Sequence, residues 1–193
     1  MGVDGDTLTP NQVARRDRVL DAAMSLAAEG GYDAVQMRDV ATRGQVALGT
    51  IYRYFSSKDQ LLVACQLELW REMAERFDRR PPVGASAADR VVDLLQRAMR
   101  AAELEPRRTA ALVTASASPD PAVRDDQIAL MATMDGVLAT AMGDLGPDLE
   151  ARLVRTLRMV WFGWLVGWVN GWHDTATVNA ELESAVRLLL GDR

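Results

Sequence analysis

Cysteine and histidine are almost absent from this sequence, and their scarcity limits the chemistry that the chain can perform. Cys65 is the one cysteine and His173 the one histidine among 193 residues. A single cysteine cannot close an intramolecular disulfide, and the two residues together offer too few sulfur and nitrogen ligands for a zinc site. The sequence also has no Gly-x-Ser-x-Gly motif and no phosphate-binding loop. We therefore expect no metal, no cofactor and no enzymatic activity.

A long hydrophobic run is also lacking. The longest apolar stretch, 159–169, is shorter than the roughly 18 residues that a membrane-spanning helix needs. The first eleven residues contain Asp4 and Asp6 and no basic segment, so they do not have the pattern of a signal peptide. We expect no membrane association, and a location in the reducing cytoplasm.

Helical periodicity is present from end to end. Apolar residues recur at spacings of three and four, and glycine and proline separate the periodic segments. No alternating pattern typical of strands occurs. The sequence therefore predicts an all-α fold, with helices over 13–29, 37–43, 48–55, 58–77, 87–102, 106–115, 121–142, 149–172 (the longest) and a last segment around 182–189 that ends at Gly191.

Charge is unevenly divided along the chain. The whole sequence carries 22 basic and 27 acidic residues, a formal charge of −5, which disfavours non-specific nucleic-acid binding by the whole surface. Residues 15–58 hold seven basic and five acidic residues, whereas residues 59–193 hold 15 and 20. A modestly basic segment is compatible with a nucleic-acid contact face, although a solvated helical surface would have the same composition.

Two short predicted helices, 37–43 and 48–55, are joined by a tight turn. Their length and spacing are typical of a helix-turn-helix, in which the second helix lies in a major groove. Gly49 would let the backbone approach a phosphate, and Arg53 has the donors for a bidentate contact with guanine. Lys58 adds an ammonium group to a helix N-terminus, which itself favours anions.

These residues also resemble a known family. The run 31–35 (Gly-Tyr-Asp-Ala-Val), the pair Val40-Ala41 and the run 46–59 (Val-Ala-Leu-Gly-Thr-Ile-Tyr-Arg-Tyr-Phe-Ser-Ser-Lys-Asp) are similar to the TetR family of bacterial repressors. The resemblance covers about residues 12–72. It implies a homodimer in which each subunit has a three-helix DNA-binding domain and a larger helical effector domain, whose last two helices form the dimer bundle. It also implies release from a palindromic operator when a ligand binds.

The resemblance assigns expected roles to individual positions. Gln36 and Ala47 stand where the family usually has Ser or Thr, so we expect weakened capping at the starts of both short helices. Tyr32, Ile51 and Phe55 have the spacing of a small helical core rather than of base contacts. The expected DNA contacts are Gln36, Arg38, Leu48, Gly49, Thr50, Tyr52, Arg53, Tyr54 and Lys58.

The same resemblance suggests how the chain is divided. We expect a flexible tail over 1–11, a DNA-binding domain over 12–58, a connecting helix over 59–80, and an effector-binding and dimerisation domain over 81–193. The expected partners are a double-stranded DNA operator, a small-molecule effector and a second copy of the chain.

Methionine and tryptophan are the candidates for the effector pocket and the dimer interface. Methionine offers flexible, polarizable surface suited to an irregular apolar ligand, although ordinary core packing explains each one equally well. Tryptophans and glycines recur together between residues 161 and 172, which favours a close helix–helix interface. The predicted pocket residues are Met99, Met131, Met134, Met142, Trp161 and Trp164. The predicted interface residues are Trp164, Gly167, Trp168, Gly171, Leu182, Val186 and Leu189.

Cys65 and His173 have ordinary structural explanations. Cys65 lies on an apolar helix face, where an inert core thiol is expected rather than a redox sensor. His173 stands at a helix end, where the helix dipole favours a cation.

Two further interpretations concern the function itself. Several strings, among them 46–55 and 185–192, resemble actinobacterial regulators of sterol catabolism of the KstR type, which implies an effector such as a sterol-derived or other acyl-CoA thioester. The alternative is a helical protein–protein adaptor that does not bind specific DNA.

Overall fold

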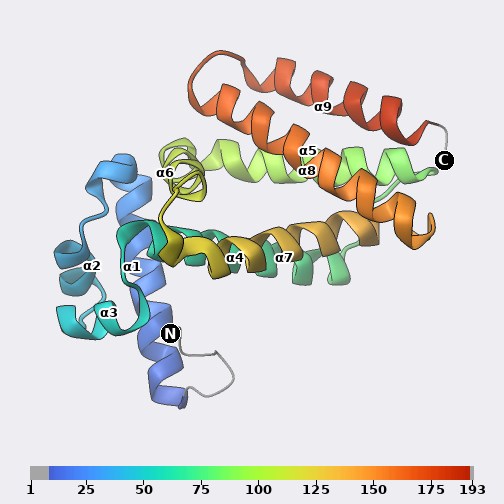
Figure 1. Ribbon diagram of the computed structural model, residues 1–193. Helices are drawn as coiled ribbons and strands as arrows, with labels where there is room; N and C mark the ends of the chain where they lie inside the picture. Colours follow the sequence, from blue (N-terminus) through green and yellow to red (C-terminus); the bar gives the residue numbers. More distant parts are fainter. Residues whose placement is uncertain (1–8, 192–193) are drawn as a thin grey trace. The chain divides into compact units, whose positions relative to one another are not determined.

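The computed structural model describes residues 9–191, and in this range the chain is built from helices with no strand (Figure 1). The all-α prediction is confirmed. The elements are α1 (Pro10–Ala34), α2 (Met37–Arg43), α3 (Leu48–Tyr54), α4 (Lys58–Arg79), α5 (Ala87–Leu104), α6 (Pro106–Ser116), the 3-10 turn η2 (Pro121–Val123), α7 (Arg124–Met142), α8 (Pro147–Val169) and α9 (Thr175–Leu190).

The chain forms two compact units. The N-terminal unit runs to Glu68 and also contains Arg107–Leu130, and the C-terminal unit contains Leu69–Pro106 and Met131–Arg193. Helices α4 and α7 therefore each begin in the first unit and continue into the second. The division into functional domains predicted above stays a prediction. Residues 1–8 of the predicted tail lie outside the described residues, whereas Pro10 and Asn11 belong to α1.

Helix α1 is the platform of the N-terminal unit. Its buried residues recur at helical spacing and include Val19, Ala23 and Ala27, each fully buried. Helices α2 and α3 pack against it. Ile51 of α3 is fully buried and Phe55, which follows α3, is nearly so, as the sequence predicts for a small helical core.

The ends of these helices follow from local sequence. Gly31 has φ 72°, a left-handed conformation that bends the last turn of α1 just after the predicted stop at Gly30. The spacing of Ser57 and Gln60 predicts a capping box at the start of α4, and the Gln60 amide donates to Ser57 Oγ at 3.2 Å, as the N-cap requires. The reciprocal bond differs from a capping box, because the Gln60 side chain accepts from the Ser56 amide instead.

In the C-terminal unit, α9 packs against α5 and α8 (Figure 1). It does so through buried residues spaced four apart, Val178, Leu182, Val186 and Leu190. Arg187 of α9 bonds to Asp89 of α5 at 3.2 Å. The bonds of Asp89 to Ser86, and after them this contact with Arg187, lower the pKa of the Asp89 carboxyl.

Helix α7 is held at its C-terminal end by α5. The Arg90 guanidinium donates to the carbonyls of Ala141 at 2.9 Å and Met142 at 3.1 Å. A cation at the C-terminus of a helix satisfies carbonyls that have no intrahelical partner and is favoured by the helix dipole.

The structure corrects several details of the sequence interpretation. Helical spacing predicts one apolar stripe on α7, made of Ile128, Met131, Met134, Leu138 and Met142. Ile128 and Met131 are instead exposed, because the apolar residues of α7 are spread around the helix. Helix α8 is not the longest, since α1 has 25 residues and α8 has 23. Trp172 and Gly171 lie beyond the end of α8, so the predicted stripe of four tryptophans is shorter.

No single helix among the described residues is long and apolar enough to span a membrane, and only the bent pair 121–142 with 147–169 reaches that hydropathy when its two helices are counted together.

Gly167 generates a prediction about stability. A Cβ built there would lie 2.8 Å from His173 Cδ2, and the His173 ring packs against Trp164 with centroids 4.9 Å apart. We expect Gly167→Ala to displace the ring and lower the free energy of unfolding by about 1–2 kcal/mol, as overpacking does.

The matched control is Gly136→Ala, because a Cβ at Gly136 on α7 has no neighbour within 4 Å. That variant should raise the free energy of unfolding by about 0.5–1 kcal/mol through helix propensity alone. Urea unfolding of both variants measures the difference. Equal stabilities would show that His173 adapts to the added methyl group without cost.

Candidate nucleic-acid interface

The turn between α2 and α3 is fixed tightly against α1. A Cβ at Gly44 would lie only 3.2 Å from the Arg18 carbonyl oxygen, and Arg18 Nε donates to the Gly44 carbonyl at 3.3 Å. Gln45 has φ 52°, the left-handed conformation that turns the chain toward α3. Packing and this turn set the angle between α2 and α3, because neither Gln36 nor Ala47 caps its helix with a side chain. The missing side-chain caps at those two positions are as expected.

Helix α3 has one buried and one open face. Ile51 is fully buried toward α1, whereas Gly49, Tyr52 and Arg53 are exposed. These three residues have the i, i+3, i+4 spacing that places side chains on one side of a helix. Tyr52 is 53% exposed, and no atom lies within 4 Å of a Cβ built at Gly49. The open face of α3 therefore offers a phenol, a guanidinium and bare backbone together.

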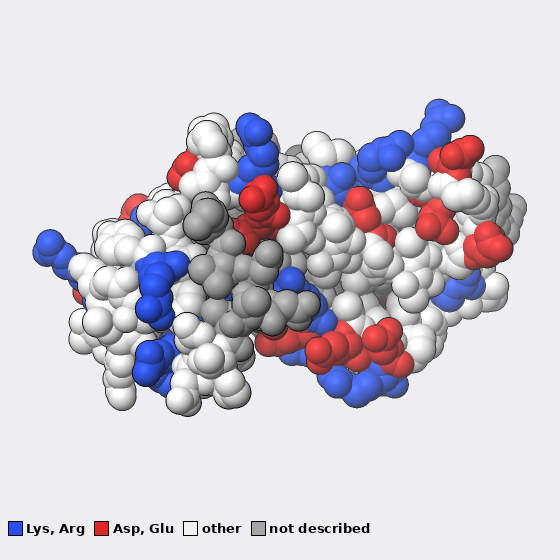
Figure 2. All heavy atoms as spheres, turned by 60° about the horizontal axis from the view of Figure 1, so that its bottom comes forward, with Lys and Arg blue, Asp and Glu red and all other residues white. Residues whose placement is uncertain are grey.

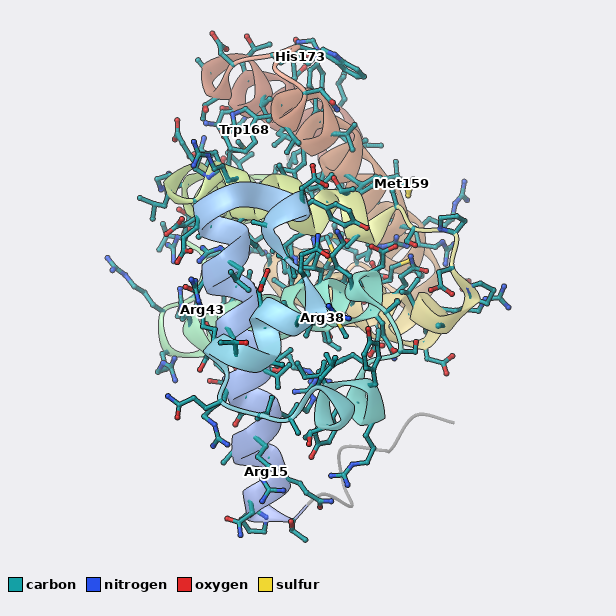
Figure 3. The ribbon with its side chains drawn as sticks, turned by 90° about the vertical axis from the view of Figure 1, so that its left-hand side faces the viewer. Arg15, Arg38, Arg43, Met159, Trp168 and His173 are labelled. Atoms are coloured by element: carbon teal, nitrogen blue, oxygen red, sulfur yellow. The ribbon has the colours of Figure 1, made fainter. Side chains whose placement is uncertain are left out.

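The other predicted contacts differ in how free they are. Leu48 and Thr50 are half-buried, and Gln36 is exposed but donates to the Asp33 carbonyl at 2.9 Å. Arg38 is exposed on α2 and lies on the side of the unit that Figure 3 faces.

Tyr54 and Lys58 are turned toward the protein. The Tyr54 hydroxyl is buried and has no hydrogen-bond partner, and the Arg53 guanidinium lies 5.5 Å from the centre of its ring. The Lys58 ammonium lies 3.6 Å from the Tyr32 ring centre and donates to the Tyr32 carbonyl at 3.2 Å. DNA contact by these two residues stays a prediction. In this conformation the Tyr54 hydroxyl is buried and the Lys58 ammonium lies on the Tyr32 ring.

Arg43 is one of the seven basic residues of the segment 15–58, and its side chain bonds to other residues of the N-terminal unit. Its guanidinium donates to both carboxylate oxygens of Glu29 and to Ser25 Oγ, which joins α2 to α1. The bond to Arg43 lowers the pKa of Glu29. Within residues 9–191, Arg15 and Arg38 make no such side-chain bond, and Figure 3 shows Arg15 near the start of α1 and Arg38 and Arg43 on α2.

The surface of this end of the N-terminal unit carries scattered basic side chains. At the left of Figure 2, where α1, α2 and α3 lie, separated blue groups stand among white ones and little red is visible. The net charge of −5 of the whole chain is therefore not reflected on this face, in keeping with the modestly basic composition of residues 15–58.

A polar cluster that the sequence interpretation missed lies beside this face. We call it the Asp59 cluster: Tyr32, Lys58, Asp59 and Ser118. One Asp59 carboxylate oxygen accepts from the Tyr32 hydroxyl, and the other accepts from Ser118 Oγ at 2.6 Å. Asp59 follows a predicted contact residue, but no local pattern links it to Ser118, which is 59 positions away.

Burial and the adjacent Asp59 carboxylate raise the pKa of Tyr32 to about 12. Both causes disfavour the phenolate. Because the pKa in the folded state lies above the unfolded value of 10, this phenol contributes stability below about pH 10 and loses it as the pH rises toward 12.

Spectrophotometric titration of the phenols tests this environment. Wild-type protein should show a tyrosine that ionises only near pH 12, and Tyr32→Phe should lack that late step. Refolding after return to neutral pH is the control for alkaline unfolding. A late step that survives in Tyr32→Phe would contradict the assignment.

An apolar groove of the C-terminal unit lies between the second half of α4 and the second half of α7. Its volume is about 260 Å³, slightly below the usual range of ligand pockets. The lining is Ala74, Phe77, Asp78, Pro82, Ala132, Thr133, Gly136, Val137, Thr140 and Ala141.

None of the six predicted effector-pocket residues lines this groove. Met99, Met134, Met142 and Trp161 are buried, Met131 is exposed and Trp164 packs on His173. Their role as a pocket stays a prediction, and the four buried residues belong to the packed interior of the unit.

The predicted dimer residues also lie mainly inside their own subunit. Leu182 and Val186 face α5 and α8, Gly167 meets His173, and Trp168 Nε1 donates to Thr175 Oγ1 at 3.1 Å. Leu189 is half-buried and Gly171 is exposed in the loop. The prediction of these residues as an interface is untested.

The exposed faces of the last two helices carry other residues. On α8 these include Met159, which is 59% exposed and labelled in Figure 3, and Gly163. On α9 a row of exposed residues spaced four apart consists of Ala176, Ala180, Ser184 and Leu188, of which Leu188 is 83% exposed, and the polar residues Thr177, Glu181 and Arg187 are exposed beside it.

Fold and site together define a helical protein with an N-terminal helix-turn-helix and a separate helical body. Residues 19–65 match the family of bacterial regulatory proteins named after TetR, and residues 84–189 match the tetracyclin repressor-like C-terminal domain. The chain therefore belongs to the TetR family.

Individual relatives extend the match over nearly the whole chain. The HTH-type transcriptional repressor KstR of Rhodococcus jostii is 41% identical, covering 97% of this chain and 88% of the relative. KstR of Mycobacterium tuberculosis is 35% identical, covering 94% and 83%. A TetR transcriptional regulator from Rhodococcus sp. RHA1 has a crystal structure with a TM-score of 0.87 and 31% identity, covering 94% of this chain and 98% of that one. The predicted resemblance to KstR-type repressors is confirmed, and the chain is a transcriptional repressor of this type.

Proposed function

We propose that this repressor binds a palindromic operator as a homodimer and leaves it when an apolar effector binds the C-terminal unit. The observation that carries the proposal is the open face of α3, on which Gly49, Tyr52 and Arg53 stand together while Ile51 fixes the helix to α1. Two such helices placed about 34 to 36 Å apart would enter successive major grooves.

The chemistry of the open face suits this role. Arg53 can read guanine or bind phosphate, and Tyr52 adds a hydroxyl on a rigid ring. Arg38 lies exposed on α2, where a cation can hold the sugar–phosphate backbone. Because Arg43 is paired with Glu29, operator binding depends on few cations, and each one carries a large share of the affinity.

Removing Arg53 tests the DNA contact. We expect Arg53→Ala to weaken operator binding by about 1–3 kcal/mol of binding free energy, which raises Kd. The slope of log affinity against log salt concentration should decrease in magnitude by about one. Lys58→Ala should act in the same direction if the ammonium leaves Tyr32 on binding. Fluorescence anisotropy of labelled DNA from upstream of the protein's own gene, at several salt concentrations, measures both quantities.

Arg79→Ala is the matched control, because Arg79 is an exposed arginine at the end of α4 in the other unit. It removes the same charge and should leave Kd within about twofold. An Arg53→Ala protein that binds as tightly as wild type would rule out this docking.

Dimerisation is proposed to use the exposed faces of α8 and α9. Met159 and Leu188 are large apolar side chains that the subunit leaves in water, and Gly163, Ala180 and Ser184 permit close helix approach. An apolar face of this kind on two adjacent helices is the type of surface that homodimers bury.

Substituting Leu188 tests this interface. Leu188→Glu places a charge in the proposed contact and should yield monomers with a mass near 21.2 kDa in light scattering, together with loss of operator binding. Leu104→Glu is the control, because Leu104 is 82% exposed on α5 and lies outside the proposed contact. If both variants remain dimeric, another surface joins the subunits.

The effector is proposed to be an apolar molecule of the sterol-derived or other acyl-CoA thioester class. Support comes from the resemblance to KstR repressors and from the predominantly apolar residues of the C-terminal unit. The ligand acts only through its different affinities for the DNA-bound and released conformations.

A panel of sterol-derived acyl-CoA thioesters, added to the preformed complex with DNA, tests the ligand class. Release by one thioester supports the proposal, whereas selective DNA binding that no thioester disturbs removes the sterol effector and leaves the repressor. Absence of selective DNA binding would favour the alternative, a helical adaptor protein.

A further inference from the structure

The first turn of α4 is held by hydrogen bonds from two directions. The Asp59 carboxylate accepts from the Tyr32 hydroxyl at the end of α1 and from the Ser118 hydroxyl, at 2.6 Å, in the loop between α6 and α7. Bonds to an ionised acceptor are stronger than bonds between neutral groups. Asp59 therefore joins three segments that are distant in sequence.

The Ser118 side of this contact is itself rigid. The Gln127 side chain of α7 donates to the carbonyls of Ser116 at 3.0 Å and Ser118 at 3.1 Å, which closes the loop onto the start of α7. A second bond runs parallel, from Gln60 Nε2 to Asp126 Oδ2 at 3.0 Å. The corner formed by the end of α6, the loop and the start of α7 thus holds α4 at two successive residues.

The Tyr32 side is equally constrained. The Lys58 ammonium packs on the Tyr32 ring and bonds to its carbonyl. From α6, Arg107 donates to the Glu29 carbonyl at 2.7 Å. The end of α1 is therefore fixed between α4 and α6.

The Asp59 cluster lies where the chain leaves α3 and enters α4. Helix α3 ends at Tyr54, and three residues separate it from α4, so the first turn of α4 determines where α3 ends. Helices α4 and α7 both start near the Asp59 cluster and both continue into the C-terminal unit.

We propose that Asp59 is a positioning residue for the recognition helix, because its bonds to Tyr32 and Ser118 fix the first turn of α4 and with it the orientation of α3 on DNA. The inference rests on the proposed function and assigns its control to the Tyr32–Asp59–Ser118 contact. Asp59 does not touch DNA in this proposal. It fixes the start of α4 so that the exposed face of α3 meets the groove in one orientation.

Operator affinity and its salt dependence together test the proposal. Ser118→Ala removes one donor to Asp59 and should weaken operator binding about five- to tenfold, the loss expected for one hydrogen bond to a charged group. The salt slope should not change, because no phosphate contact is removed. Ser118→Thr, which restores a hydroxyl, should recover the wild-type affinity.

Two further variants separate positioning from stability. Thr114→Val on α6 removes an exposed hydroxyl that bonds only to its own helix at Ala110, and it should leave Kd within twofold. Tyr32→Phe removes the other donor to Asp59. If the Asp59 cluster acts as a unit, the double variant Tyr32→Phe with Ser118→Ala binds the operator no more weakly than the single variant that has the lower affinity.

All variants are measured at a temperature at which circular dichroism shows them fully folded. An unchanged Kd for Ser118→Ala, an equal loss in Thr114→Val, a reduced salt slope or strictly additive effects in the double variant would each overturn the proposal. A wild-type protein that binds no DNA selectively would instead refute the proposed function, so the two failures are distinguishable.

Discussion

The recognition surface depends on the packing of two helices that are too short to be stable alone. Helices α2 and α3 have seven residues each, well below the length at which an isolated helix persists in water. Neither has a side-chain N-cap. Their existence and their mutual angle therefore come from burial against α1, with Gly44 admitting the close approach and Ile51 filling the contact. Whatever moves α1 or the start of α4 moves the DNA-binding face.

The charges of the N-terminal unit divide between holding the fold and facing outward. Arg43 bonds to Glu29, and Lys58 is placed on Tyr32, so neither contributes a free cation in this conformation. Arg38 and Arg53 remain exposed. In a chain of net charge −5, this arrangement limits the electrostatic attraction to any DNA sequence and leaves discrimination to a few specific contacts.

Local sequence predicted the elements well, because their signals are local. The helix-turn-helix, the cap at Ser57 and the stop at Gly191 depend on residues a few positions apart, whereas α1 bends at Gly31 and continues to Ala34, beyond its predicted end at residue 29. Helix orientation and long-range contacts could not be predicted in this way. The periodicity of α7 did not reveal that Ile128 and Met131 face outward, since apolar residues lie on several of its faces. The Asp59 cluster joins residues 32, 59 and 118, which only the folded chain brings together.

The two-unit organisation also constrains how a ligand could act. Helix α6 and the first part of α7 belong to the same unit as α1, α2 and α3, so the loop that bonds to Asp59 lies in the unit that contains the helix-turn-helix. In the proposed mechanism, an effector in the C-terminal unit does not need to reorganise α2 or α3. It needs only to favour a second conformation, in which the contacts at Asp59 and Gln60 place the end of α3 differently. A small difference in ligand affinity between the two conformations then becomes a difference in operator affinity.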